Sequence, residues 1–183
     1  MAKPQKNIVR LPRHRSRAAE GAAVDVRQLI REQSLRNAIY ASLIAIIVFS
    51  VLWVMVTKLT DRVFPWMTVV LGAMLGFAVQ RTGRGVDWRF PTLAAGLTLV
   101  GAVVANIAVA ASYTAETFGT GTLHILKSVT SMTWPVFFDE VWTVADSFYA
   151  VLAASVAAFL APRRLTRSQY YALRLWRDQS DRH

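Results

Sequence analysis

The chain has 183 residues, of which 54% are hydrophobic and only 17% are charged, and its net charge is +10. A soluble domain usually carries roughly 25% charged residues. Here the charge is missing from long apolar runs, so the composition excludes an ordinary soluble domain and indicates an integral membrane protein. The chain contains no cysteine, which excludes disulfides, thiolate metal sites and iron–sulfur clusters.

Residues 1–37 form a polar tail with nine basic and three acidic residues. Its low hydrophobicity predicts a mostly disordered cytoplasmic tail. A mitochondrial transit peptide is the alternative, because such peptides are also basic and poor in acids near the start.

Four apolar segments follow, and we predict an all-α membrane bundle with transmembrane helices over residues 38–56, 64–79, 92–112 and 141–161. The first segment has no charged residue in 38–56. At 1.5 Å per residue it would be about 28 Å long, which suits a hydrocarbon core of roughly 30 Å. The connection over 113–140 has hydrophobic residues at helical spacing, which predicts an amphipathic segment lying in the outer interface.

The basic residues predict the orientation of the bundle. Both tails and the 80–91 loop together hold 18 of the 21 Lys and Arg residues. By the positive-inside rule, both termini and this loop face the cytoplasm. The last segment, 162–183, mixes arginine with aromatic residues, so we expect a basic amphipathic tail on the membrane surface. Anionic lipid explains this basic charge better than nucleic acid does, and we expect no nucleic-acid partner.

Small residues predict where helices pack closely. Gly72 and Gly76 form a GxxxG pair in the second predicted span, which allows close approach of another helix. In the third span, every fourth residue is small or able to hydrogen-bond, so this face should meet other helices rather than lipid. Its members include Ala94, Thr98, Ala102 and Asn106.

The 80–91 loop contains Gly83 and Gly85 among arginines, an arrangement that could bind a phosphate through backbone N–H groups. The loop lacks the GK[ST] ending of a P-loop. We therefore favour a tight helix-to-helix turn in which arginines contact lipid headgroups. The residues expected to make headgroup contacts are Arg81, Arg84, Arg89, Arg163 and Arg164.

Asp146 is the only charged residue within the four predicted spans, and such residues are functional candidates by default. We favour a structural carboxylate that reaches interfacial water or bonds to a neighbouring helix. The alternative is an ion or proton site that Asp146 forms with Asn106 of the third span.

We expect neither a metal site nor a cofactor. His124, Asp139 and Glu140 could hold a divalent cation on the outer side, but they have no fixed spacing, which makes the signal weak. No catalytic constellation is recognisable, so we predict no catalytic residues and no enzymatic activity.

The hairpin around the 80–91 loop resembles a group of small, uncharacterised bacterial inner-membrane proteins. The resemblance consists of Gly72-xxx-Gly76-x-Ala78-Val79, a turn with Gly83 and Gly85, and Leu93-Ala94-xx-Leu97-Thr98. It implies a four-span protein of the bacterial cytoplasmic membrane. It implies no activity, and no functional residue is carried over.

The abundance of small-residue surface favours a non-enzymatic accessory or assembly subunit that acts through helix–helix contacts. Its partners would be anionic membrane lipids and either other membrane subunits or further copies of itself. The alternative is a small transporter or channel that uses Asp146, which predicts that Asp146, Asn106 and Thr98 face one cavity.

Overall fold

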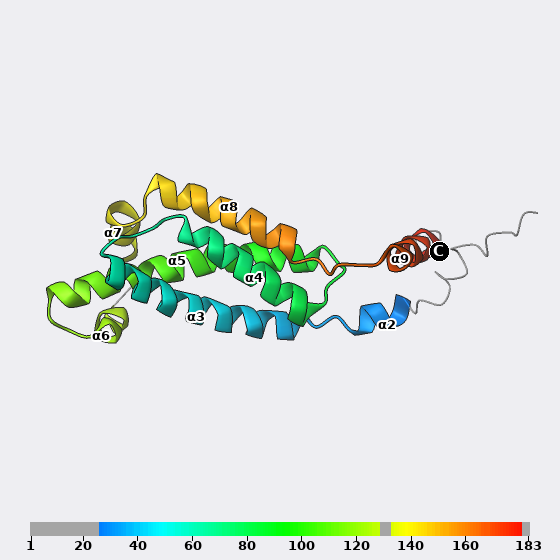
Figure 1. Ribbon diagram of the computed structural model, residues 1–183, viewed down its shortest axis with the longest axis horizontal. Helices are drawn as coiled ribbons and strands as arrows, with labels where there is room; N and C mark the ends of the chain where they lie inside the picture. Colours follow the sequence, from blue (N-terminus) through cyan, green and yellow to red (C-terminus); the bar gives the residue numbers. More distant parts are fainter. Residues whose placement is uncertain (1–25, 129–132, 181–183) are drawn as a thin grey trace, which may run out of the picture. The chain divides into compact units, whose positions relative to one another are not determined.

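The structure, a computed structural model, describes residues 26–128 and 133–180. All the regular elements in this part of the chain are α-helices, so the predicted all-α class is confirmed (Figure 1). The chain divides into two compact units, a main unit of Glu32–Arg163 and a terminal unit formed by both ends of the chain.

In the terminal unit, α2 (Val26–Arg31) contacts α9 (Arg167–Ser180). Leu29 of α2 is buried, as are Ala172 and Leu173 of α9. The described parts of the two predicted basic tails therefore contain helices that contact each other, and each helix buries apolar side chains.

Four long helices form the main unit. They are α3 (Leu35–Thr60), α4 (Met67–Gly83), α5 (Arg89–Thr117) and α8 (Val144–Leu160). The central pair, α4 and α5, contact each other, and both contact α3 and α8. Helices α3 and α8 consequently lie on opposite sides of the central pair (Figure 1).

Two of these helices, α3 and α5, are long and apolar enough to cross a membrane. Helix α8 is apolar but shorter, and α4 and α8 each contain 17 residues. The described part of the chain thus contains two candidate membrane spans by length and composition, which points to membrane association.

The helix ends differ from the predicted ones because local hydrogen bonds set them. The second predicted span starts at residue 64, whereas α4 starts at Met67, since the peptide groups of Phe64, Pro65 and Trp66 form a tight turn first. Helix α8 starts at Val144 because Thr143 caps it. In the predicted amphipathic connection, two short helices occur, α6 (Thr122–Lys127) and α7 (Thr133–Glu140), and residues 129–132 lie outside the described part.

The central core lies where the four long helices meet. Phe49 and Trp53 of α3 pack edge to face with ring centroids 5.6 Å apart. They belong to a buried cluster with Leu71 and Leu75 of α4 and with residues of α5 and α8. Burying such side chains contributes about 1.5–3 kcal/mol each where the alternative is water.

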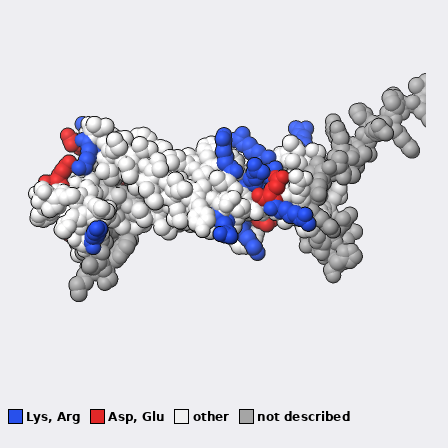
Figure 2. All heavy atoms as spheres, turned by 90° about the horizontal axis from the view of Figure 1, so that it is seen from below, with Lys and Arg blue, Asp and Glu red and all other residues white. Residues whose placement is uncertain are grey.

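The exterior of the main unit is apolar between two charged ends. Figure 2 shows two groups of charged side chains separated by a wide uncharged band. Lys58 and Glu116 pair at the end that carries the α3–α4 connection, here called the α3–α4 end. Arg81, Arg84 and Arg89 lie at the opposite end, the α4–α5 end, which carries the turn between those helices. In the uncharged band α3 exposes large apolar side chains, among them Leu43, Ile44, Ile47, Val48, Val51, Leu52 and Met55.

The small residues pack within the chain. A Cβ atom on Gly72 would lie 2.3 Å from the carbonyl oxygen of Ala153, and one on Gly76 would lie 2.7 Å from Cβ of Leu160. The GxxxG pair therefore lets α4 approach α8 closely.

Candidate functional site

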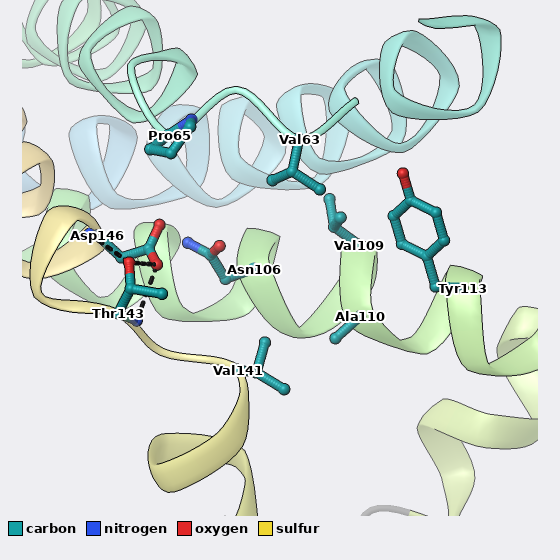
Figure 3. A pocket seen from close by; sticks show the side chains of 9 residues that line it. All are labelled: Val63, Pro65, Asn106, Val109, Ala110, Tyr113, Val141, Thr143 and Asp146. Carbon is teal, nitrogen blue, oxygen red and sulfur yellow. Dashed lines mark hydrogen bonds between the residues drawn. The ribbon is translucent and has the colours of Figure 1, made fainter. Parts of the chain in front are cut away.

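A pocket of about 300 Å³ lies at the α3–α4 end of the main unit (Figure 3). Its walls come from the α3–α4 connection, from α5, and from the start of α8 with the residues before it. The lining residues are Val63, Pro65, Asn106, Val109, Ala110, Tyr113, Val141, Thr143 and Asp146.

Asp146 is held in the first turn of α8 by a capping box. The backbone N–H of Thr143 donates to Oδ2 of Asp146 over 2.9 Å, and the Thr143 hydroxyl donates to the same oxygen over 2.6 Å. In return the N–H of Asp146 donates to Oγ1 of Thr143 over 3.2 Å. The carboxylate thus satisfies the helix start, where the helix dipole also favours negative charge.

The other oxygen of Asp146 is uncommitted. Both bonds from Thr143 go to Oδ2, and Oδ1 has no hydrogen-bond partner among the described residues. Asp146 is nevertheless only 6% exposed. Oδ1 is not among the fully buried side-chain atoms of the described residues that lack a partner, so it borders the open space of the pocket, where a donor or a cation can reach it.

Asn106 brings a second acceptor to the pocket from α5. Its Nδ2 donates to the carbonyl oxygen of Ala102 over 3.0 Å, one turn earlier on the same helix. This bond fixes the amide and leaves Oδ1 without a partner among the described residues, although the residue is only 7% exposed. Figure 3 shows the side chains of Asn106 and Asp146 side by side in the pocket wall.

The pocket wall carries an acidic residue and no basic one. None of the nine lining residues is basic, and five of them have purely aliphatic side chains: Val63, Pro65, Val109, Ala110 and Val141. The polar groups gather at the end with Asp146, Thr143 and Asn106, while Tyr113 lies at the opposite end (Figure 3). The pocket therefore combines one acidic end with an apolar body.

Thr98 is not part of the pocket. It is fully buried, and its hydroxyl donates to the carbonyl oxygen of Ala94 over 2.7 Å. Ala94 and Ala102 are fully buried as well, so the small-residue face of α5 packs inside this bundle. Of the three residues expected in one cavity, the structure brings together Asp146 and Asn106 only.

Five fully buried side-chain atoms of the described residues have no hydrogen-bond partner. They are Oγ of Ser42, Nε1 of Trp53, Oγ1 of Thr57 and Oγ1 of Thr68, together with Nε2 of Gln33. Polar atoms of this kind usually bind internal water. Ser42, Trp53 and Thr57 share the buried side of α3, so this side is the natural place for bound water.

The ring of Phe90, at the start of α5, fills the turn between α4 and α5. A Cβ on Gly85 would lie 2.0 Å from the ring of Phe90, and one on Gly83 would lie 2.8 Å from the same ring. The carbonyl oxygens of Gly83 and Gly85 accept hydrogen bonds from the N–H groups of Ser34 and Arg163. This geometry is that of a closed structural turn rather than a phosphate cradle.

The arginines at this end differ in their availability. Arg163 donates to Glu32 over 2.9 Å, and Arg84 lies 3.7 Å from the same carboxylate. Gln80 further ties the turn to the end of α8 by donating to the carbonyl oxygen of Pro162 over 2.9 Å. Of the arginines predicted to contact headgroups, Arg81, Arg84, Arg89 and Arg164 are exposed, and Arg163 is partly buried.

The weak metal hypothesis gains no support from the described residues. His124 lies in α6, and Asp139 and Glu140 lie at the end of α7. No group of three or more potential ligands is found within residues 26–128 and 133–180.

Sequence reasoning identified Asp146 and Asn106 but missed the other seven lining residues. One of them carried a readable signal, since Thr143-x-x-Asp146 before an apolar run is a capping-box pattern. Val63, Pro65 and Tyr113 carried none, because only the packing of α5 against α8 and the α3–α4 connection brings them together.

Comparison of the chain with protein-family models, with curated proteins and with solved structures finds no match.

Proposed function

We propose that this chain is a non-enzymatic, four-span protein of the bacterial cytoplasmic membrane that binds a cation or a proton at Asp146 and acts as a small transporter or channel. One observation carries the proposal. Asn106 of α5 and Asp146 of α8 are 40 positions apart in the sequence, both are more than nine-tenths buried, and both line the same pocket.

The packing of the bundle supports four spans. Helices α4 and α8, with 17 residues each, are about 25 Å long at 1.5 Å per residue. Helix α4 lies in contact with both α3 and α5, which are long enough to cross a membrane. A bilayer that surrounds α3 and α5 would therefore also surround α4, and α8 covers the other side of the central pair.

The distribution of charge supports the orientation. Within the described main unit the α4–α5 end carries five basic residues, Arg36, Arg81, Arg84, Arg89 and Arg163, whereas the α3–α4 end carries three, Lys58, Arg62 and Lys127 (Figure 2). The positive-inside rule puts the arginine-rich end in the cytoplasm. The pocket then opens toward the outer side of the membrane.

The surroundings of Asp146 support a cationic ligand. A carboxylate inside a membrane bundle is costly unless it is paired. The capping box satisfies one oxygen, and a bound cation or proton would satisfy the other.

A second candidate function is the accessory subunit. The small-residue faces no longer argue for it, because Gly72, Gly76 and the face of α5 are used inside the chain. The observation that still favours it is the row of large apolar side chains that α3 exposes, which fits another membrane helix as well as lipid. A protein that copurifies in mild detergent in fixed stoichiometry would support this function, and a clean monomer would contradict it.

The transport function is tested by flux. The purified protein is reconstituted into vesicles, and uptake of protons or of monovalent cations is followed after a gradient is imposed. Replacing Asp146 by Asn should lower the rate at least about tenfold, because it removes the charge and keeps an oxygen that can accept the capping bonds.

The matched control is Asp139→Asn, which removes an exposed carboxylate from α7, outside the pocket. It should leave the flux at the wild-type rate. Equal flux in the wild type and Asp146→Asn would contradict the transport function.

A further inference from the structure

The pocket also indicates which class of cation it accepts, an inference that rests on the proposed function. We propose that the ligand is a small organic primary ammonium ion, with its charged head at Asp146 and Asn106 and a short apolar body directed toward Tyr113.

The charged head fits the uncommitted acceptors. Oδ1 of Asp146 and Oδ1 of Asn106 have no hydrogen-bond partner among the described residues, and both residues line the pocket. An ammonium group has three N–H donors and no acceptor. Two donors can meet these oxygens, and the third can meet a water molecule in the pocket.

The number of oxygen ligands argues against a bare metal ion. Ca²⁺ takes six to eight oxygens, and Mg²⁺ requires a near-octahedral shell. The side chains of the pocket leave two free carbonyl-type oxygens, since Oγ1 of Thr143 is already engaged with the carboxylate and the N–H of Asp146. A Ca²⁺ or Mg²⁺ ion would therefore lose more hydration than these two oxygens replace.

The apolar body fits the rest of the pocket. From Asn106 onward the lining follows α5 through Val109 and Ala110 to Tyr113, and Val63 and Val141 face this stretch (Figure 3). An alkyl chain buried here would contribute about 0.8 kcal/mol per CH₂ group. The volume of about 300 Å³ is at the low end for ligand pockets, which limits the ligand to a small molecule.

The acidic end and the apolar body of the pocket together make it selective for an ammonium ion. An anion would lie against the Asp146 carboxylate with no basic residue in the pocket wall to offset the repulsion. A neutral alcohol of the same shape would fill the apolar body but leave the carboxylate without a counter-charge. Both should therefore bind more weakly than the ammonium ion.

The experiment measures binding by calorimetry on the purified protein in mild detergent at neutral pH. The probes are n-butylammonium, methylammonium, 1-butanol and potassium, each as a separate titration. Butylammonium should bind most tightly, and Asp146→Asn should weaken it at least about tenfold because a charge-assisted hydrogen bond is lost. Asp139→Asn should bind as the wild type does.

A second variant tests the apolar part of the pocket without changing the Thr143–Asp146 capping box. Ala110→Leu fills the apolar body without touching Asp146 or Thr143, so it should weaken butylammonium and leave methylammonium unchanged. Potassium binding as tightly as butylammonium, or butylammonium binding that is insensitive to both variants, would overturn the inference. Asp146-dependent flux without ammonium binding would overturn the ligand class alone, whereas ammonium binding without flux would overturn the transport function alone.

Discussion

The two oxygens of Asp146 meet different surroundings, and this difference underlies the functional proposal. Oδ2 receives both capping bonds from Thr143, while Oδ1 faces the pocket without a partner among the described residues. A purely structural carboxylate would need only the first set of bonds. The sequence suggested Asp146 and Asn106 as a pair. It could not show that the two oxygens of Asp146 differ in their hydrogen-bond partners, because this depends on side-chain geometry.

At the α4–α5 turn, glycine is required by space rather than by a ligand. Replacing Gly85 by Ala should destabilise the protein by about 1–3 kcal/mol, because the new methyl group would overlap the ring of Phe90. The loss is measured by reversible unfolding in mixed micelles.

The control is Gly96→Ala on α5, where an added Cβ meets nothing within 4 Å. It should be neutral or stabilising by up to about 1 kcal/mol, because alanine lowers the entropy of the unfolded chain. Equal stability of Gly85→Ala and Gly96→Ala would refute the explanation from Phe90.

At the scale of helices, the sequence located every long helix of the main unit, because each contains an apolar run bounded by polar residues. It placed the ends less well. Helix α3 runs from Leu35 to Thr60, beyond the predicted 38–56, and α5 runs from Arg89 to Thr117, beyond 92–112. Hydropathy reports the apolar part of a helix, whereas the backbone hydrogen bonds of the helix continue into its polar ends.

The sequence could not identify the helix that packs against the GxxxG pair. The motif predicts a close contact but does not say whether the partner lies in the same chain. Here Gly72 and Gly76 face Ala153, Ala157 and Leu160 of α8. The observation that first suggested a subunit role is thus explained by the fold of a single chain.

The close contact between α4 and α8 gives a sharp prediction. Gly72→Ala should destabilise the bundle by about 2 kcal/mol or more, because the new Cβ would lie 2.3 Å from a backbone oxygen that cannot rotate away. Because α8 also carries Asp146, the same change should lower the flux. An unfolding free energy equal to that of Gly96→Ala would contradict this packing.

At the scale of the main unit, two charged ends and an apolar band between them determine how the protein would lie in a bilayer (Figure 2). The arginine-rich end is tied together by Glu32, Arg163 and the Gly83–Gly85 carbonyl groups. The opposite end carries the Lys58–Glu116 pair and contains the pocket. Counting basic residues in the sequence predicted that one end of the bundle is richer in arginine. The pocket could not be predicted, because it depends on how α5 and α8 are rotated relative to each other, which no local sequence pattern encodes.

The orientation of the pocket is the claim on which the functional account depends most. The chain contains no cysteine, so a single cysteine can be introduced at Val63, in the pocket wall, or at Asp87, in the α4–α5 turn. Right-side-out membrane vesicles are treated with a membrane-impermeant maleimide. Val63→Cys should be labelled in intact vesicles, and Asp87→Cys should be labelled only after permeabilisation. Labelling of Asp87→Cys in intact vesicles, with Val63→Cys protected, would contradict this orientation.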